Sequence, residues 1–148
     1  MMIGYNNRPE ATAEGRWTDS EGRGFIRTGD LGRFDAEGFL QIVGRKKDMI
    51  ISGGFNIYPI DLEIQIDAHP EVVEAAVIGV PDAKWGETPV AYVVRQPGAT
   101  IEAEALRVWA NERLGSLQRV SAITFVDELP RNGLGKVLKT ALAEMAAA

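Results

Sequence analysis

The sequence contains no cysteine and a single histidine, His69, among its 148 residues. A disulfide framework is therefore excluded. A metal site or a nucleophile pair built from His and Cys within this chain is excluded as well, because such sites need more than one of these side chains. A domain of this length buries about 68–70% of the surface of its unfolded chain, so it needs neither a disulfide nor a structural metal for its core.

Positive charge is also scarce: 16 Lys and Arg stand against 21 Asp and Glu, which gives a net charge of −5. Nucleic acids and anionic membranes attract proteins through basic faces, so we expect no nucleic-acid partner. No apolar run approaches the roughly 20 residues of a membrane-spanning helix, and we expect no membrane span. The first five residues are too short and uncharged for a signal peptide. Together with the lack of cysteine, this predicts a cytoplasmic protein.

Glycine is unevenly distributed, with ten of the 16 glycines in residues 1–54. Two short apolar runs, 24–27 and 39–43, each follow an Asp-x-Glu-Gly turn, which favours β-hairpins over helices. Isolated hairpins with few large apolar residues form no core of their own. We therefore interpret this part as a fragment of a larger domain that is mobile or packs on a neighbouring copy, with Trp17 and Phe25 left uncovered.

From about Arg45 onwards, strand and helix signals of normal length alternate. The apolar runs 72–80 and 90–94 and the segment 123–126 predict buried strands. These elements predict an α+β fold, a small mixed sheet with flanking helices over residues 46–148, preceded by the β-hairpins.

Two helices are predicted from apolar residues that recur at helical spacing. The first spans residues 102–114, with Thr100 as N-cap and Gly115 as its end. The second lies at the end of the chain. Their apolar faces consist of Leu106, Trp109, Ala110 and Leu114 in the first helix and Leu138, Ala141, Leu142 and Met145 in the second.

The segment 60–66 gives conflicting signals. Its isoleucines and leucine alternate with polar residues, which favours a strand. Pro59, however, suits the first position of a helix, and Asp61 and Glu63 suit a first turn. Periodicity by itself favours the strand.

Asp30 ends the segment Arg27-Thr28-Gly29-Asp30, in which an acid follows a glycine directly after a predicted strand. A carboxylate held in this way can accept two hydrogen bonds from the neighbouring hydroxyls of a ribose. The alternative is an aspartate in a hairpin turn, which is the commoner use of this residue.

The second segment with unusual residues is Gly44-Arg45-Lys46-Lys47-Asp48. Three consecutive cations at a change of composition suit a hinge, although a solvated linker would carry the same charges. Gly53-Gly54 follows within an apolar run. It indicates a bulge or a close approach of another backbone or a ligand, or alternatively a simple turn.

The third segment, residues 129–136, predicts a flexible loop that delivers Lys136 at the start of the last helix. A cation at a helix N-terminus is disfavoured by about a few tenths of a kcal/mol, so stability does not explain this lysine. An anionic ligand would explain it, whereas the alternative is an exposed lysine beside Lys139 on a solvated face. The segment lacks the spacing and the Ser/Thr of a P-loop, and no serine lies in a Gly-x-Ser-x-Gly elbow.

In this order, the three segments resemble the adenylate-forming enzymes, which include acyl- and aryl-CoA synthetases, luciferases and the adenylation domains of peptide synthetases. The resemblance covers nearly the whole chain. Its most specific residues are Arg27-Thr28-Gly29-Asp30, Gly44-Arg45 with Ser52-Gly53-Gly54, and Pro130-Arg131-Asn132 with Gly135-Lys136.

The resemblance implies a role for each of these positions. Asp30 would bind the ribose hydroxyls of ATP, and Arg45 would lie near that ribose. Lys47 would fall at the hinge between a large and a small domain. Lys136 would contact the carboxylate substrate and the α-phosphate while the acyl-adenylate forms, where its charge would stabilise the reaction.

For the second half-reaction, the resemblance implies that the small domain rotates and brings Gly53-Gly54 against the pantetheine of coenzyme A. Trp85 would pack on coenzyme A, and Arg119 would meet its phosphates. Residues 117–121 depart from the usual aromatic-Lys-x-Pro-Lys pattern, so among them only Arg119 is expected to do so. The resemblance also implies a helix over residues 59–68.

The resemblance implies two domains: residues 1–45 as the terminal β-hairpin segment of a large adenylation domain, and residues 46–148 as a C-terminal lid. The large domain is then the expected partner, and we expect the chain to be inactive alone. The implied enzyme is an ATP-dependent acyl-CoA synthetase that uses ATP, Mg²⁺ and coenzyme A on a small carboxylic acid. The alternatives are an adenylation domain that loads a carrier protein, and a free-standing, non-catalytic binding module.

Overall fold

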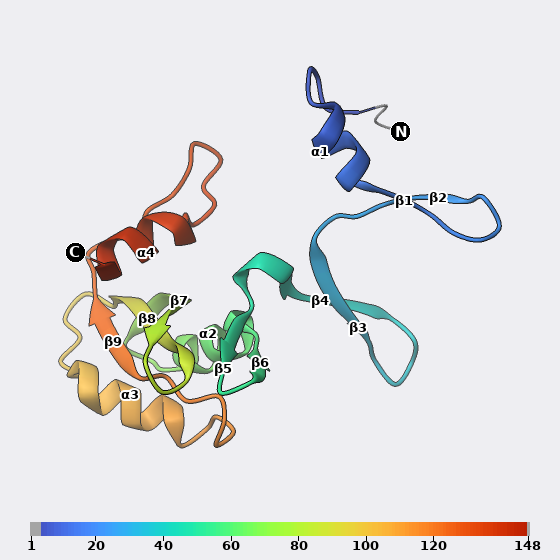
Figure 1. Ribbon diagram of the computed structural model, residues 1–148. Helices are drawn as coiled ribbons and strands as arrows, with labels where there is room; N and C mark the ends of the chain where they lie inside the picture. Colours follow the sequence, from blue (N-terminus) through green and yellow to red (C-terminus); the bar gives the residue numbers. More distant parts are fainter. Residues whose placement is uncertain (1–3, 148) are drawn as a thin grey trace. The chain divides into compact units, whose positions relative to one another are not determined.

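The computed structural model describes residues 4–147, and the chain divides into two compact units, residues 1–46 and 47–148 (Figure 1). The first unit contains one short helix and two separate hairpins. Helix α1 spans Pro9–Glu14, strand β1 (Arg16–Thr18) pairs with β2 (Gly24–Ile26), and β3 (Asp30–Phe34) pairs with β4 (Leu40–Arg45). The predicted hairpins are confirmed, whereas α1 was not predicted.

Both hairpin turns of the first unit are built in the same way. Asp19 accepts hydrogen bonds from the backbone N–H groups of Glu21 and Arg23, and Asp35 accepts them from Glu37 and Phe39. An aspartate that binds the backbone two residues further on is a recognised turn-former. The Asp-x-Glu-Gly pattern therefore predicted both turns, and the aspartate side chains hold them through these hydrogen bonds.

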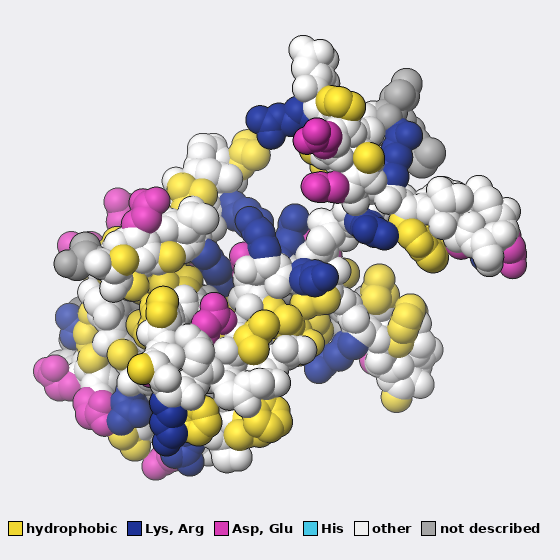
Figure 2. Space-filling view, viewed as in Figure 1, with side chains coloured by type: hydrophobic (Ala, Val, Ile, Leu, Met, Phe, Trp, Pro, Cys, Tyr) yellow, Lys and Arg dark blue, Asp and Glu magenta, His cyan; other side chains and the backbone are white. Residues whose placement is uncertain are grey.

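The first unit has no buried core among its described residues, 4–46. Trp17 and Phe25 contact each other across the β1–β2 hairpin with ring centroids 5.1 Å apart, yet both stay more than two-fifths exposed. Figure 2 shows hydrophobic side chains at the surface of the β3–β4 hairpin, where Phe34 and Phe39 are 74% and 66% exposed. The predicted absence of a core is confirmed.

The second unit contains a mixed five-stranded sheet. After a 3₁₀ turn over Lys46–Asp48 come β5 (Ile50–Ser52), β6 (Phe55–Ile57), β7 (Val72–Asp82), β8 (Gly86–Arg95) and β9 (Ala122–Phe125). The strand order is β6-β5-β8-β7 with antiparallel pairs, and β9 runs parallel to β8. The predicted strands are confirmed, although β7 and β8 extend further because they continue to a shared turn.

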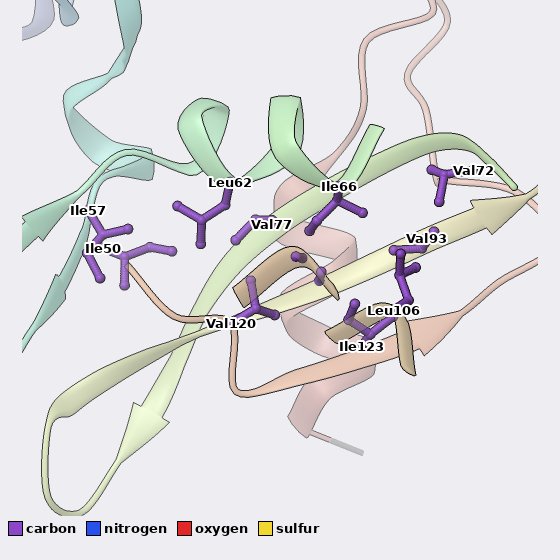
Figure 3. Close-up of a cluster of buried hydrophobic side chains, with 12 residues drawn as sticks. Ile50, Ile57, Leu62, Ile66, Val72, Val77, Val93, Leu106, Val120 and Ile123 are labelled. Carbon is purple, nitrogen blue, oxygen red and sulfur yellow. The ribbon is translucent and has the colours of Figure 1, made fainter. Parts of the chain in front are cut away.

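Helices cover both faces of this sheet. Helices α2 (Pro59–Asp67) and α3 (Ala103–Asn111) pack on one face, and α4 (Lys139–Ala147) packs on the other. Successive strand residues point to opposite faces, so Val77 joins the first cluster while its neighbours join the second. Figure 3 shows the first cluster, in which side chains from α2 and α3 point toward those of the strands. The buried residues are Ile50, Ile57, Leu62, Ile66, Val72, Val77, Ala91, Val93, Leu106, Ala110, Val120 and Ile123 in the first cluster, and Ala76, Ile78, Tyr92, Leu129 and Leu142 in the second.

The helix that the resemblance implied over residues 59–68 is confirmed, and the strand favoured by periodicity is wrong. Leu62 and Ile66 are fully buried at a spacing of four, while Ile60 and Ile64 lie on the outer side of α2. Pro59 occupies the first turn of the helix, as its fixed φ favours. Apolar residues at every second position, which suggested a strand, therefore lie on two different faces of this helix, one buried and one exposed.

Several helix details differ from the predictions. Thr100 is not the N-cap of α3: that position is Glu102, and the Thr100 N–H binds the carboxylate of Glu71 instead. The helix ends at Asn111, before Gly115. Of the four apolar residues predicted for the last helix, Leu138 precedes α4, and only Leu142 is buried.

Candidate functional site

Asp30 and Arg45 lie opposite each other in the β3–β4 pair. The Arg45 Nε is 2.7 Å from Asp30 Oδ1, and Arg45 Nη1 reaches the Thr28 carbonyl at 3.5 Å. Asp30 is the first residue of β3, so its interpretation as a hairpin-turn aspartate is wrong. The structure brings together the two residues that the resemblance assigned to a ribose. The ion pair fixes one carboxylate oxygen of Asp30, while the other has no partner among residues 4–147.

Lys47 is exposed and lies at the boundary between the two units, within the 3₁₀ turn Lys46–Asp48. Lys47 lines a pocket of about 190 Å³ in the second unit, together with Glu87 and Lys139. The boundary thus falls on the cation-rich segment that the sequence singled out.

Gly53 and Gly54 form the two-residue turn between β5 and β6, with φ angles of 58° and 83°. These left-handed values suit a type I′ hairpin turn. The close approach is present too, since a Cβ on Gly53 would lie 2.8 Å from Cε3 of Trp85. The Gly53 N–H also donates to the Trp85 carbonyl at 2.8 Å. The bulge is therefore wrong, while the turn and the close approach are both confirmed.

Trp85 lies in the turn between β7 and β8. Asp82 Oδ1 orders this turn by accepting the N–H groups of Lys84 and Trp85, both at 2.8 Å. The indole is 48% exposed, and the ammonium of Lys84 lies 4.6 Å from its ring centroid. An exposed aromatic ring over a glycine turn, with a cation beside it, offers a flat apolar surface next to positive charge.

Arg119 is exposed and precedes β9, where it lines a pocket of about 210 Å³ with Arg107. Ser121 then binds the Pro89 carbonyl, close to the start of β8. Gly86, the first residue of β8, pairs with Ser52, which precedes the Gly53-Gly54 turn. Arg119 therefore lies near the same end of the sheet as this turn and Trp85.

Lys136 lies in the loop between β9 and α4 and is exposed. It precedes the first residue of α4, Lys139, by three positions, so its expected place at the helix start is wrong. Within residues 4–147 its ammonium has no ion pair or hydrogen bond. Lys139 is instead held between α4 and α2: its Nζ lies 2.7 Å from Glu63 and 3.0 Å from the Val77 carbonyl, so it does not lie on a solvated face.

The Lys136 loop and the Gly53–Trp85 region lie at opposite ends of the sheet (Figure 1). Arg131 in the loop forms an ion pair with Glu74 near the beginning of β7, whereas Trp85 follows the end of that strand. At about 3.3 Å per residue, the stretch from Glu74 to Asp82 spans roughly 26 Å. Within the second unit, the sheet thus separates Lys136 from Gly53, Gly54 and Trp85.

Sequence reasoning missed the residues that hold the Lys136 loop, namely Glu74 and the side-chain contacts of Arg131 and Asn132. The Asn132-Gly133 dipeptide was a detectable turn signal. Glu74 carried none, since it is 57 residues away from Arg131 in the sequence. Among residues 4–147, no group of three or more metal-ligating side chains is found, and no helix is long and apolar enough to cross a membrane.

Comparison with known proteins gives consistent matches. The profile of the family described as AMP-binding enzyme C-terminal domain matches residues 61–136. The chain is 43% identical to a 2-succinylbenzoate–CoA ligase of Geobacillus kaustophilus and 44% identical to the long-chain-fatty-acid–CoA ligase FadD13 of Mycobacterium tuberculosis, over 96% and 97% of its length. It superposes on ATP-bound MatB from Rhodopseudomonas palustris with a TM-score of 0.86 and 45% identity, covering 97% of the chain. It spans only 27–28% of each of these relatives.

Proposed function

Because the chain belongs to the family of AMP-binding enzyme C-terminal domains, we propose that it is the C-terminal part of an AMP-forming acid–CoA ligase. Such an enzyme joins a carboxylic acid to ATP, releases pyrophosphate and holds an acyl-adenylate. Coenzyme A then displaces AMP to give the acyl-CoA. The observation that carries this proposal is the ammonium of Lys136, unpaired within residues 4–147, at one end of the sheet and the Gly53–Trp85 surface at the other.

In this proposal, residues 1–45 end a large adenylation domain, residues 46–148 form its lid, and Lys47 is the hinge. The division of the chain after Lys46 supports it, and so does the lack of buried residues among residues 4–46. The apolar side chains of these hairpins need a partner surface, which the large domain would supply. The proposal includes a cytoplasmic location, with which the cysteine-free sequence accords.

Asp30 and Arg45 are proposed to bind the ribose of ATP. The ion pair orients the Asp30 carboxylate and leaves one oxygen available for the two vicinal hydroxyls. Mg²⁺ would be bound by the ATP phosphates and by residues of the large domain, because residues 4–147 hold no cluster of metal ligands. ATP thus supplies the ion together with the nucleotide.

Lys136 is proposed to stabilise the adenylation step. Attack of the carboxylate on the α-phosphorus builds negative charge on the phosphoryl oxygens while pyrophosphate leaves. An ammonium that has no partner in the described part of the chain can meet that charge without first breaking an ion pair. The exposed loop allows the lysine to enter a site formed by the large domain.

Coenzyme A is proposed to bind at the other end of the sheet. The side-chain-free Gly53-Gly54 turn lets an extended pantetheine approach the backbone, and Trp85 offers an exposed ring beside it. Arg119 lies exposed at the same end, and a guanidinium suits phosphate groups. The adenylate must meet each end of the lid in turn, so the proposal requires the lid to rotate between the two half-reactions.

The proposal is tested in the full-length protein by exchange of pyrophosphate into ATP in the presence of Mg²⁺ and a carboxylic acid. We expect Lys136→Ala to lower this exchange by roughly 100-fold or more. AMP should be released only after coenzyme A is added. Release that needs a carrier protein instead would favour the carrier-loading alternative, and pyrophosphate exchange by the 148-residue chain alone would overturn the proposal.

A further inference from the structure

We propose that Arg131, Asn132 and Glu74 are positioning residues for Lys136, which they hold at a fixed place relative to the sheet. This inference rests on the proposed role of Lys136. It concerns residues that need not touch the substrate themselves but that determine where the ammonium of Lys136 can reach.

Residues 131–136 of the loop around Lys136 make no apolar packing contact with the second cluster, although Leu129 before them belongs to it and Val137 after them packs against it. Leu134, its largest apolar side chain, is 94% exposed, and every residue from 131 to 136 is exposed. The loop also contains Gly133 and Gly135, the latter with φ of 80°. Ordering each such residue costs about 1–2 kcal/mol, so polar contacts must hold this conformation.

Asn132 binds the backbone of Lys136 on both sides. Its Oδ1 accepts the N–H of Lys136 at 2.9 Å and that of Leu134 at 3.0 Å. The Asn132 N–H donates to the Lys136 carbonyl at 2.9 Å. Both backbone polar groups of Lys136 are therefore satisfied by one residue, which fixes the direction in which the lysine leaves the loop.

Arg131 connects this turn to the sheet. Its Nη1 donates to the Gly135 carbonyl at 2.7 Å, and its Nη2 pairs with Glu74 of strand β7. The planar guanidinium makes both contacts at once, which a lysine cannot do with the same geometry. Gly135, the residue directly before Lys136, is thus connected to the edge strand β7 through the side chain of Arg131.

A purely stabilising role does not account for this arrangement. The side chains of Arg131 and Glu74 are 41% and 33% exposed, and ion pairs this accessible contribute little to folding. Losing the pair should leave global stability nearly unchanged while it frees the loop. Order of the loop and stability of the fold can therefore be measured separately.

The first test is ¹⁵N relaxation of the 148-residue chain. We expect the order parameters of the Gly135 and Lys136 amides to fall from about 0.85 to below about 0.6 in Arg131→Gln and Glu74→Gln. Arg113→Gln is the matched control, because Arg113 is 42% exposed and also donates to a backbone carbonyl, that of Trp109 at 2.9 Å. Unchanged loop amides in both test variants, or an equal fall in the control, would overturn the inference.

The second test is adenylation by the full-length protein. Arg131→Gln should lower kcat by roughly 10- to 100-fold with little change in KM for ATP, and Arg131→Lys should recover part of this loss. Thioester formation from supplied acyl-adenylate should be unaffected. A mobile loop with undiminished adenylation would refute the positioning role. Adenylation that survives Lys136→Ala would instead refute the proposed function, while the relaxation data would still report on the loop.

Discussion

The backbone of Gly53 has φ of 58°, and a Cβ at this position would lie 2.8 Å from Cε3 of the Trp85 ring. Two constraints therefore act on one residue. The left-handed conformation disfavours any side chain with a Cβ, and the indole leaves no room for one. Gly54 has a similar φ of 83°, but no heavy atom of the described residues lies within 4 Å of the point that a Cβ would occupy, so it carries only the first constraint.

This difference predicts unequal effects of two neighbouring substitutions. Gly54→Ala should destabilise the fold by about 1 kcal/mol, the cost of a left-handed alanine. Gly53→Ala should cost more and should displace Trp85, which would shift the indole N–H resonance of that residue. Urea unfolding and NMR spectra of the two variants check this. Equal stabilities with an unmoved Trp85 signal would show that the ring does not require a glycine.

Asp67, the last residue of α2, has a carboxyl whose pKa is raised by its surroundings. The pKa of its carboxyl is raised to about 6, mainly by desolvation. The negative charges of Glu63 and Glu74 raise this pKa as well, whereas a hydrogen bond from the Ala75 backbone lowers it. The folded chain therefore keeps a proton on Asp67 at pH values where the unfolded chain has lost it. Between about pH 4 and pH 6, this group makes the fold less stable as pH rises.

Asp67→Asn should consequently stabilise the chain at pH 7, because asparagine cannot ionise and still offers an acceptor to Ala75. The stabilities of the two proteins should differ less and less as the pH falls from about 6 toward 3.8, and Asp67 is protonated in both states only well below 3.8. Urea unfolding of both proteins across this range gives the comparison. A stability difference that does not vary with pH would contradict the raised pKa.

At the scale of elements, α2 joins the sheet by its inner face and by its acidic side chains. Glu63 accepts the Val77 N–H at 2.9 Å, and Lys139 of α4 binds both Glu63 and the Val77 carbonyl. Strand β7 is at the edge of the sheet, so these contacts satisfy backbone groups on the side that faces away from β8. The ion pair thereby protects the edge from pairing with another chain.

The buried and exposed faces of α2 predict different losses of stability for substitutions on each. Leu62→Ala should cost about 2–5 kcal/mol, because Leu62 is fully buried and its truncation leaves a cavity. Ile64→Ala removes a 55% exposed side chain from the same helix and should change stability by less than about 0.5 kcal/mol. Chemical unfolding of both variants checks the assignment. Comparable losses would mean that α2 does not pack as described.

The sequence predicted the strands and helices better than their ends and the contacts between them. Val72, Val77 and Val93 lie in long apolar runs, so their strands were visible in the pattern. The end of α3 at Asn111 was not, because Asn111 uses its side chain to bind the backbone of Val120, a contact that no spacing reveals. For the candidate site, motif residues such as Asp30 and Arg45 were found, whereas Glu74 depends on tertiary contact alone.

At the scale of the whole molecule, the second unit has chemically different ends. One end presents an exposed cationic loop, and the other presents a glycine turn with an exposed indole. Glu74, which binds the Lys136 loop, and Asp82, which binds the Trp85 turn, lie roughly 26 Å apart along β7, so a small reacting group cannot contact both ends at once. If both ends act on one adenylate, they must do so in sequence, and each half-reaction should depend on its own end.

The decisive measurement is therefore the rate of thioester formation from supplied acyl-adenylate and coenzyme A, in the full-length protein, for Lys136→Ala and Trp85→Ala side by side. We expect Lys136→Ala to keep a rate close to that of the wild type although it no longer forms the adenylate. Trp85→Ala should need a roughly 10-fold higher concentration of coenzyme A, since an aromatic contact with a ligand contributes about 1.4 kcal/mol. Equal loss of thioester formation in both variants would show that the two ends do not divide the reaction between them.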